Sequence, residues 1–215
     1  MGGAQGLLRW RVDHRHGMMT PMDASADPAP TIRIPDGSLV VLVGPAGAGK
    51  TTFARAHFRP TEILSSDAFR AMLADDEADQ RVNRAAFELL HLAAAGRLAG
   101  RRLTVIDATN VTHAARRALL DLARAARRPA IAIVFDLPEA DCQERNRRRP
   151  GRAVDPAIVA RQASQQRRAL ERGALAAEGF AAIHLLRSPS EVDATRIERV
   201  GPPPRSRRVS PAAAC

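Results

Sequence analysis

The sequence predicts an α/β fold in which an open parallel sheet carries helices on both faces. Two observations indicate it. From residue 39 to residue 186, short apolar runs that fit buried strands alternate with longer helical stretches. The first run, Leu39 to Val43, leads directly into GPAGAGKT (Gly44 to Thr51), and a helical stretch follows. Strand, glycine loop and helix are the context that a phosphate-binding P-loop requires, so we expect a P-loop NTPase-type sheet.

The other elements continue this alternation. We expect strands at residues 39–43, 62–64, 103–106, 130–137 and 181–186. We expect helices at 50–57, from Asp67 through Leu73, and at 82–98, 113–127, 138–148 and 156–177, with a break at Pro150-Gly151. Proline and small polar residues flank this region, which gives three parts: a disordered N-terminal extension at 1–31, one kinase-sized P-loop domain at 32–195, and a disordered Pro/Arg-rich tail at 196–215.

Charge and cysteine content limit the possible partners and compartments. The 215-residue chain carries a formal charge of +10 and has a pI near 11.4, which favours polyanionic partners, nucleic acid first. The alternative is that an arginine-rich composition makes proteins basic in general. Two cysteines form no disulfide framework, and no apolar run reaches the roughly 18 residues of a membrane helix, so we expect a cytoplasmic protein without a membrane partner.

Lys50 is the only lysine in the sequence, although Lys and Arg together number 33. A P-loop needs a compact ammonium that can lie along the β- and γ-phosphates, and a planar guanidinium has the wrong shape for that place. We therefore expect a working site for ATP and Mg²⁺ rather than a glycine-rich turn without a ligand. Its predicted nucleotide-binding residues are Gly44, Pro45, Ala46, Gly47, Ala48, Gly49, Lys50, Thr51 and Thr52, with the Thr51 hydroxyl on the metal.

Two aspartates follow predicted strands at the edge where open α/β sheets bind ligands. Asp67 is either a general base, with Arg70 as a nearby cation, or the N-cap of the next helix. Asp107 resembles a Walker B carboxylate near Mg²⁺, the alternative again being a helix cap. The next residue is Ala108, where AAA-type ATPases place a glutamate that activates water, so transfer to an acceptor is favoured over hydrolysis.

Five arginines lie between Arg145 and Arg152 and cross the Pro-Gly break. If the segment is helical up to the break, Arg145 and Arg149 share a face that Arg152 extends. It is then either a mobile lid that brings guanidiniums onto a transferring phosphoryl group or an ordinary solvated basic face.

These features, in this order, resemble the 5′-kinase domain of bacterial polynucleotide kinase–phosphatase. The similarity runs from about Leu39 to Val192 and includes FRPTEILSSD, AFELLH, TVIDATNV, VFDLPE and ERNRRRP. It implies that Asp67 is the general base for a 5′-hydroxyl and that Arg70 engages the neighbouring acceptor phosphate. It also implies that Arg145 and Arg152 are lid residues on the donor phosphates, while Lys50 and Thr51 match the P-loop lysine and the metal-binding hydroxyl.

The resemblance has limits. The chain has Thr51 where the family usually has serine, and it has no length for the phosphatase and ligase domains that follow in that family, so we expect neither activity. The implied function is an ATP- and Mg²⁺-dependent kinase acting on 5′-OH ends of DNA or RNA. The alternatives are a P-loop kinase for a small hydroxylated molecule and an ATP-binding switch without phosphotransfer.

Overall fold

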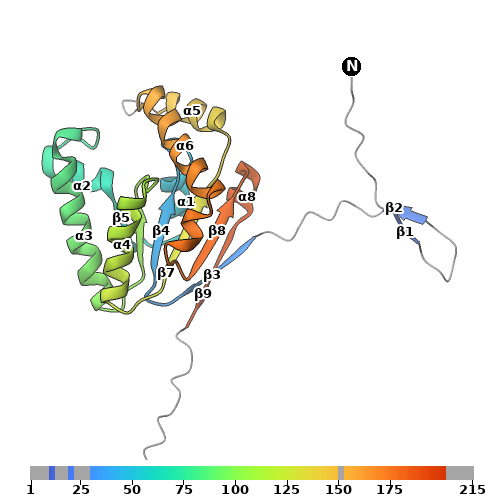
Figure 1. Cartoon of the computed structure of the whole chain (residues 1–215), viewed down its shortest axis with the longest axis horizontal. Helices are drawn as coiled ribbons and strands as arrows, with labels where there is room; N and C mark the ends of the chain where they lie inside the picture. The colour runs from blue at the N-terminus through green and yellow to red at the C-terminus, as the bar shows by residue number, and fades with distance from the viewer. Residues whose placement is uncertain (1–9, 13–18, 22–29, 150–152, 202–215) are drawn as a thin grey trace, which may run out of the picture.

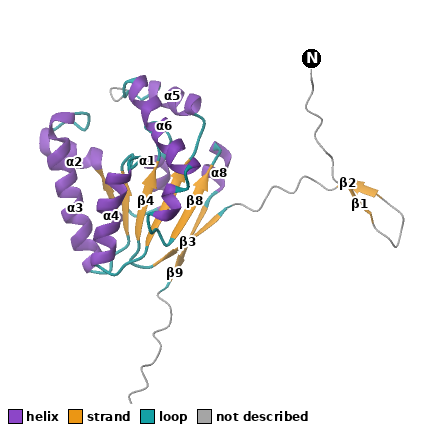
Figure 2. Ribbon diagram, in the orientation of Figure 1, coloured by secondary structure: helices purple, strands orange, loops and turns teal. Residues whose placement is uncertain are grey.

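A five-stranded parallel sheet forms the centre of the protein (Figures 1 and 2). The structure is a computed structural model that describes residues 10–12, 19–21, 30–149 and 153–201. The strand order is β5-β6-β4-β7-β8, and every neighbouring pair is parallel. The strands are β4 (Leu39–Val43), β5 (Ile63–Ser65), β6 (Thr104–Asp107), β7 (Ala130–Phe135) and β8 (Ala182–Leu186). The predicted fold class is confirmed.

Side chains of the sheet alternate between two buried layers, as the pleat of a strand requires. On β4, Leu39, Val41 and Val43 pack in one apolar cluster, and Val40 and Leu42 pack in the other. The first cluster lies under α3 (Asn83–Ala99), α4 (His113–Ala125) and α7 (Ala174–Ala177). The second lies under α1 (Lys50–His57) and α8 (Pro189–Ala194). Helices therefore cover both faces.

The remaining helices stand near the carboxyl edge of the sheet. Figure 1 shows α2 (Ser66–Ala74) with α3 on one side, and α5 (Glu139–Arg147) with α6 (Pro156–Glu171) on the other. The central strand β4 pairs with β6 on one side and with β7 on the other. The chain order reverses at β4, and such a switch point is where open α/β sheets bind ligands.

A second small sheet corrects two predicted boundaries. β3 (Thr31–Pro35) pairs in parallel with β9 (Arg196–Val200), so Thr31 is not part of an extension and residues 196–200 are not part of a tail. The physical reason is burial and pairing: Ile32 and Ile34 enter the core, and Arg199 on β9 forms two hydrogen bonds, of 3.0 and 2.7 Å, with the Glu62 carboxylate. The polar composition of β9 concealed it.

Further elements differ from the prediction. β1 (Trp10–Val12) and β2 (Met19–Pro21) pair antiparallel within the predicted disordered extension. The rest of 1–29 and residues 202–215 lie outside the described residues. The helix predicted at 156–177 is two helices, because Gly173 adopts φ 62° between α6 and α7. Short turns of η1 (Pro60–Glu62) and η2 (Gln80–Val82) were not predicted. No helix in the described part of the chain is long and apolar enough to cross a membrane.

A buried ion pair fixes the loop that follows β6. Arg116 on α4 and Glu178 after α7 leave only 2% and 4% of their side chains exposed, and they share two hydrogen bonds of 2.7 and 2.5 Å. Arg116 also donates to the carbonyls of Asn110 and Val111 at 3.0 and 2.8 Å. The same loop supplies the carbonyl of Thr109 that accepts a hydrogen bond from Gly44 N–H. Arg116 thus holds a segment that contacts the start of the glycine loop.

Candidate active site

The glycine loop joins β4 to the N-terminus of α1, as predicted. Gly47 and Gly49 have φ angles of 82° and 91°, a left-handed conformation that residues with a Cβ rarely adopt. The loop carbonyls of Gly44 and Pro45 accept hydrogen bonds from Lys50 Nζ at 2.9 and 2.8 Å. Backbone N–H groups of the first turn of α1 and the positive end of its dipole lie at the same place, which makes the loop a site for anions.

Lys50 is a buried cation. Burial lowers the pKa of its ammonium to about 8, and the nearby Asp107 carboxylate acts in the opposite direction. Below that pH, Lys50 is mostly protonated and its charge is compensated only in part. A polyanionic ligand in the loop would supply the missing negative charge and so stabilise the protonated form. The burial of this single lysine therefore favours binding of phosphate groups.

Asp107 and Thr51 bring oxygen atoms together beside Lys50. Burial raises the pKa of the Asp107 carboxyl, while Lys50 and a hydrogen bond from Thr51 oppose the shift. Asp107 Oδ2 is buried and has no hydrogen-bond partner in the described part of the chain. The alternative interpretation of Asp107 as a helix cap is wrong, because Thr112 caps α4 through its side chain. A carboxylate oxygen without a partner next to a hydroxyl fits Mg²⁺, which prefers oxygen ligands.

No group of three or more His, Cys, Asp or Glu residues that could hold a metal ion occurs among the described residues. Mg²⁺ in phosphotransferases is held by one or two carboxylates together with substrate phosphates. The donor set of Thr51 and Asp107 therefore fits a metal that arrives with a nucleotide, and it does not fit a closed structural site.

Asp67 lies in the first turn of α2, two residues after the N-cap residue Ser65, so the interpretation of Asp67 as the N-cap is wrong. Arg70, one turn later, pairs with Asp67 Oδ1 through Nη2. The guanidinium of Arg70 also donates to Glu77 O at 2.7 Å and to Asn83 Oδ1 at 3.1 Å. About 32% of the Asp67 side chain stays exposed, against 10% for Arg70. Arg70 thus orients a carboxylate that remains accessible.

The arginine-rich segment divides into two groups. Arg147 and Arg148 pair with Glu144 on the exposed side of α5, as the solvated-face interpretation predicts. Arg145 and Arg149 instead line the cavity at the glycine loop. A Cβ built at Gly49 would lie 3.5 Å from Arg145 Nη1, which places that guanidinium beside the loop.

The expected continuous helical face is absent here, because α5 ends at Arg147 and Arg149 lies beyond it. Asn146 fixes the geometry: its amide donates to Val154 O at 2.6 Å and accepts from Val154 N–H at 3.0 Å. Arg152, which the resemblance assigns to the same lid, lies outside the described residues.

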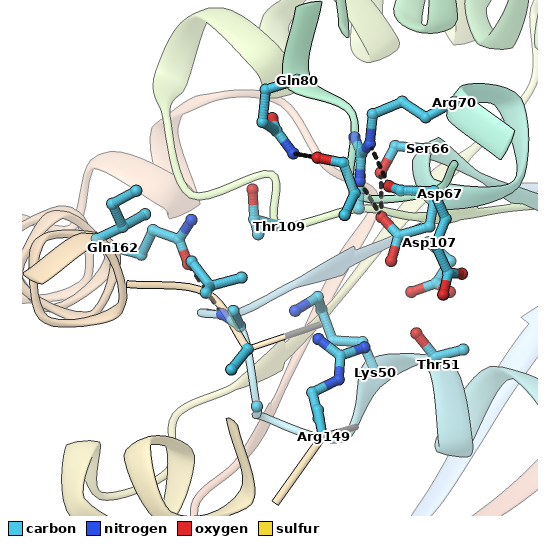
Figure 3. A pocket seen from close by; sticks show the side chains of 18 of the residues that line it. Lys50, Thr51, Ser66, Asp67, Arg70, Gln80, Asp107, Thr109, Arg149 and Gln162 are labelled. Carbon is cyan, nitrogen blue, oxygen red and sulfur yellow. Dashed lines mark hydrogen bonds and ion pairs between the residues drawn. The ribbon is translucent and has the colours of Figure 1, made fainter. Parts of the chain in front are cut away.

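One cavity of about 790 Å³ connects these groups (Figure 3). Lys50 and Thr51 from the loop, Asp107 from β6 and Asp67 with Arg70 from α2 all line it. Its volume is in the range of ordinary ligand sites. A second cavity, of about 470 Å³, shares Thr51, Asp67, Glu77 and Asp107 with the first. The predicted phosphate-binding, metal-binding and general-base residues therefore meet in one place.

One cavity residue, Gln162, was missed by the sequence-based prediction of the site, and Arg149 was predicted there only as one of two alternatives. Gln162 on α6 accepts a hydrogen bond from Ala46 N–H at 2.9 Å, which connects α6 directly to the glycine loop. Figure 3 shows Gln162 on the side of the cavity opposite Arg70, and Arg149 beside Lys50. Arg149 was visible as a member of the arginine cluster. The sequence does not indicate a role for Gln162 at the site, because a glutamine on a polar helix is ordinarily solvated.

We expect Gly47→Ala to weaken ATP binding by about tenfold or more and to destabilise the domain. The new Cβ would overlap the Cys142 carbonyl oxygen and lie 3.2 Å from Asn146 N, and the left-handed φ alone costs about 1–2 kcal/mol. Backbone atoms cannot rotate away, so the loop would have to move from α5. Isothermal titration with ATP and denaturant unfolding measure the two effects.

Gly96→Ala is the matched control. Gly96 lies inside α3, and a Cβ there would meet nothing within 4 Å. The change should leave ATP binding intact and raise stability by up to about 1 kcal/mol. Equal behaviour of the two variants would contradict the packing argument for Gly47.

The fold and the site together define a P-loop nucleotide-binding protein with a kinase-like arrangement: a parallel sheet, a glycine loop at its switch point and two helical arms over the cavity. The chain belongs to the AAA domain family, whose sequence model matches residues 39–172. No curated protein matches the sequence.

Solved structures with a similar fold include the following two. A chain of the Pnkp1/Rnl/Hen1 RNA repair complex superposes with a TM-score of 0.52 at 23% identity, covering 69% of this chain and 48% of that chain. Kti12 from Chaetomium thermophilum, solved in complex with ADP-AlF3, gives a TM-score of 0.51 at 17% identity, with coverages of 72% and 93%. The chain thus spans about half the length of the repair-complex chain. The fold implied by the resemblance to the polynucleotide kinase domain is confirmed.

Proposed function

We propose that this protein is an ATP- and Mg²⁺-dependent polynucleotide 5′-hydroxyl kinase. The observation that carries the proposal is the position of Asp67. Its carboxylate is oriented by Arg70, remains accessible, and opens into the same cavity as Lys50 and the glycine loop. A nucleotide-binding switch needs the loop and the lysine. It does not need an oriented carboxylate placed across the cavity from them.

The donor side of the reaction rests on cations from the glycine loop and from the arginine-rich segment at the end of α5. Lys50 lies within the loop and can move from the carbonyls of Gly44 and Pro45 to the β- and γ-phosphates. Arg145 and Arg149 border the same space, where guanidiniums can stabilise charge on a transferring phosphoryl group. We assign Arg152 to the same role on the resemblance alone. ATP is the phosphate donor that this arrangement fits.

Thr51 and Asp107 would hold Mg²⁺. When bound, the ion neutralises charge on the β- and γ-phosphates. The chain's contribution is the buried Asp107 Oδ2 and the Thr51 hydroxyl, which are fixed at the start of α1 and at the end of β6.

Asp67 acts on the acceptor. Its carboxylate accepts the proton of the acceptor hydroxyl as that oxygen attacks the γ-phosphorus. The bond between the γ-phosphorus and the bridging oxygen breaks, and ADP leaves with the electron pair of that bond. Arg70 keeps Asp67 in position through their ion pair. Ala108 follows Asp107 in place of a water-activating glutamate, which supports transfer over hydrolysis.

A polynucleotide is the acceptor that the charge distribution supports best. The formal charge of +10 is concentrated in the central domain, and a basic protein holds a phosphodiester chain with little sequence preference. Similarity of fold to a chain of an RNA repair complex points the same way. The rival is a kinase for a small hydroxylated molecule, which would share Lys50, Thr51 and Asp67 but would not need a basic surface.

Transfer of labelled γ-phosphate from ATP to a 5′-OH oligonucleotide tests the proposal. We expect labelling of DNA or RNA ends with Mg²⁺, at least a hundredfold slower in Lys50→Ala because the transferring phosphoryl group loses its central cation. The control for intact folding is the unfolding curve of the variant. ATP binding by the wild type with no transfer to DNA or RNA would overturn the proposal. Labelling of a sugar or nucleoside in the same assay would identify the rival.

A further inference from the structure

Helix α6 forms one wall of the cavity and then continues away from it. Ile158, Arg161 and Gln162, near its N-terminal end, line the cavity, and the helix runs on to Glu171 with Arg172 as its C-cap residue. Figure 1 shows α6 descending from the region of α5 across the front of the sheet. The helix therefore connects the cavity with the outer surface.

One exposed face of α6 carries a regular row of cations. At about 100° per residue, Arg161, Gln165, Arg168 and Arg172 point in directions within an arc of roughly 60°. All four are exposed. We call Arg161, Arg168 and Arg172 the α6 arginine row. Its first member lines the cavity and the other two lie beyond it.

The arginine row is not neutralised by the residues that the structure describes. Some exposed helical arginines elsewhere do pair with acids one turn away, such as Arg84 with Glu88 at 2.9 Å and Arg124 with Asp121 at 2.6 Å. None of the three guanidiniums in the row has an ion pair or a hydrogen bond within the described part of the chain. Glu171 is the only acid of α6, and it points about 80° away from Arg161 around the helix axis. The row is therefore a free, uniformly positive surface.

The spacing suits the backbone of a nucleic-acid strand. Arg161 and Arg172 are separated by 11 residues, which is roughly 16 Å along a helix at 1.5 Å per residue. At about 3.4 Å per nucleotide in a stacked strand, this length corresponds to about five phosphates. Aromatic residues make up only 3% of the sequence, so contacts with phosphates are more plausible here than stacking of bases.

We propose that the acceptor strand leaves the cavity along α6, with its phosphates against Arg161, Arg168 and Arg172. This inference rests on the proposed polynucleotide kinase function and adds a path for the nucleotides that follow the 5′ end. Arg161 joins the cavity to the path. Arg168 and Arg172 contact only the part of a strand that lies outside the cavity, so their contribution should depend on acceptor length.

The test compares Arg168→Gln/Arg172→Gln with Arg102→Gln/Arg117→Gln, which removes the same charge elsewhere. Arg102 precedes β6 at the opposite edge of the sheet from the glycine loop, and Arg117 is exposed on α4. Acceptors are 5′-OH DNA strands of about two and about twelve nucleotides, one shorter and one longer than the row. Transfer of labelled phosphate gives KM and kcat at several salt concentrations.

We expect the first variant to raise the KM for the long acceptor roughly tenfold and to leave kcat and the KM for ATP unchanged. The slope of log KM against log salt should fall by about 1.4, because two phosphate contacts on a single strand are lost. The first variant should keep the wild-type KM for the short acceptor. The second variant should keep the wild-type KM for both acceptors.

Other results overturn the path. They are an equal KM increase for both acceptor lengths, an equal effect of the two variants, or wild-type transfer that does not depend on acceptor length. These outcomes leave the proposed function standing. If the wild type labels no oligonucleotide of either length while it still binds ATP, the proposed function itself fails, and the path fails with it.

Discussion

Replacement of Asp67 by asparagine is expected to lower the rate of phosphoryl transfer by about 10²- to 10⁴-fold, the usual contribution of a general base. Asparagine keeps the shape of the side chain, but its amide cannot accept the proton of the acceptor hydroxyl at neutral pH. Because Asp67 lies across the cavity from the loop, affinity for ATP should change little. Single-turnover transfer and titration with ATP separate the two quantities.

Asp75→Asn is the matched control for this variant. Asp75 is exposed at the C-cap of the same helix, with a φ of 54°, a conformation that asparagine tolerates well. It should transfer phosphate at the wild-type rate. Wild-type rates in Asp67→Asn would remove Asp67 from the chemistry and leave it as the ion-pair partner of Arg70.

The second large effect concerns stability. We expect Glu178→Ala to destabilise the domain by about 3–5 kcal/mol, because it leaves the buried guanidinium of Arg116 without its carboxylate. The loss should also weaken ATP binding, since Arg116 holds the loop whose Thr109 carbonyl contacts Gly44 N–H. Denaturant unfolding measures the free energy, and titration with ATP measures the binding.

Glu198→Ala tests the same substitution at an exposed ion pair. Glu198 pairs with Arg33 at 3.0 Å, but the two side chains are 50% and 69% exposed. Surface pairs contribute at most about 1 kcal/mol, so this variant should remain close to wild type. If Glu178→Ala lowers the free energy of unfolding as little as Glu198→Ala does, the buried Arg116–Glu178 pair contributes no more stability than an exposed pair.

Much of the fold could be predicted because its elements have strong local patterns. The all-apolar run of β4 and the glycine loop after it located α1 to the residue. β9 could not be predicted in this way. It is short and contains Arg196, Glu198 and Arg199, and its partner β3 is far away in the sequence, so no local pattern reveals the pairing. The break after α6 was missed because a single glycine in a helical pattern is often tolerated.

The site residues could be predicted where a chemically suitable side chain stands next to a strand end or in the glycine loop. Lys50 and Thr51 belong to the glycine loop, and Asp67 and Asp107 lie at or just after the ends of strands. Parallel strands bring their carboxyl ends to one edge. The cavity-facing position of Arg149 was harder to predict, because the direction of its side chain depends on where α5 ends. Gln162 reaches the loop only through the tertiary position of α6.

The pairing of β3 with β9 also has a consequence for synthesis of the chain. Arg33 and Glu198, which face each other across the two strands, are separated by 165 positions. On a ribosome, β3 emerges early, and the buried side chains of Ile32 and Ile34 must then remain without their neighbouring strand until nearly the whole domain has been translated. Closing such a long loop is slow compared with local folding. Nascent chains released before residue 200 should therefore expose this strand edge and depend on chaperones more than the finished domain does.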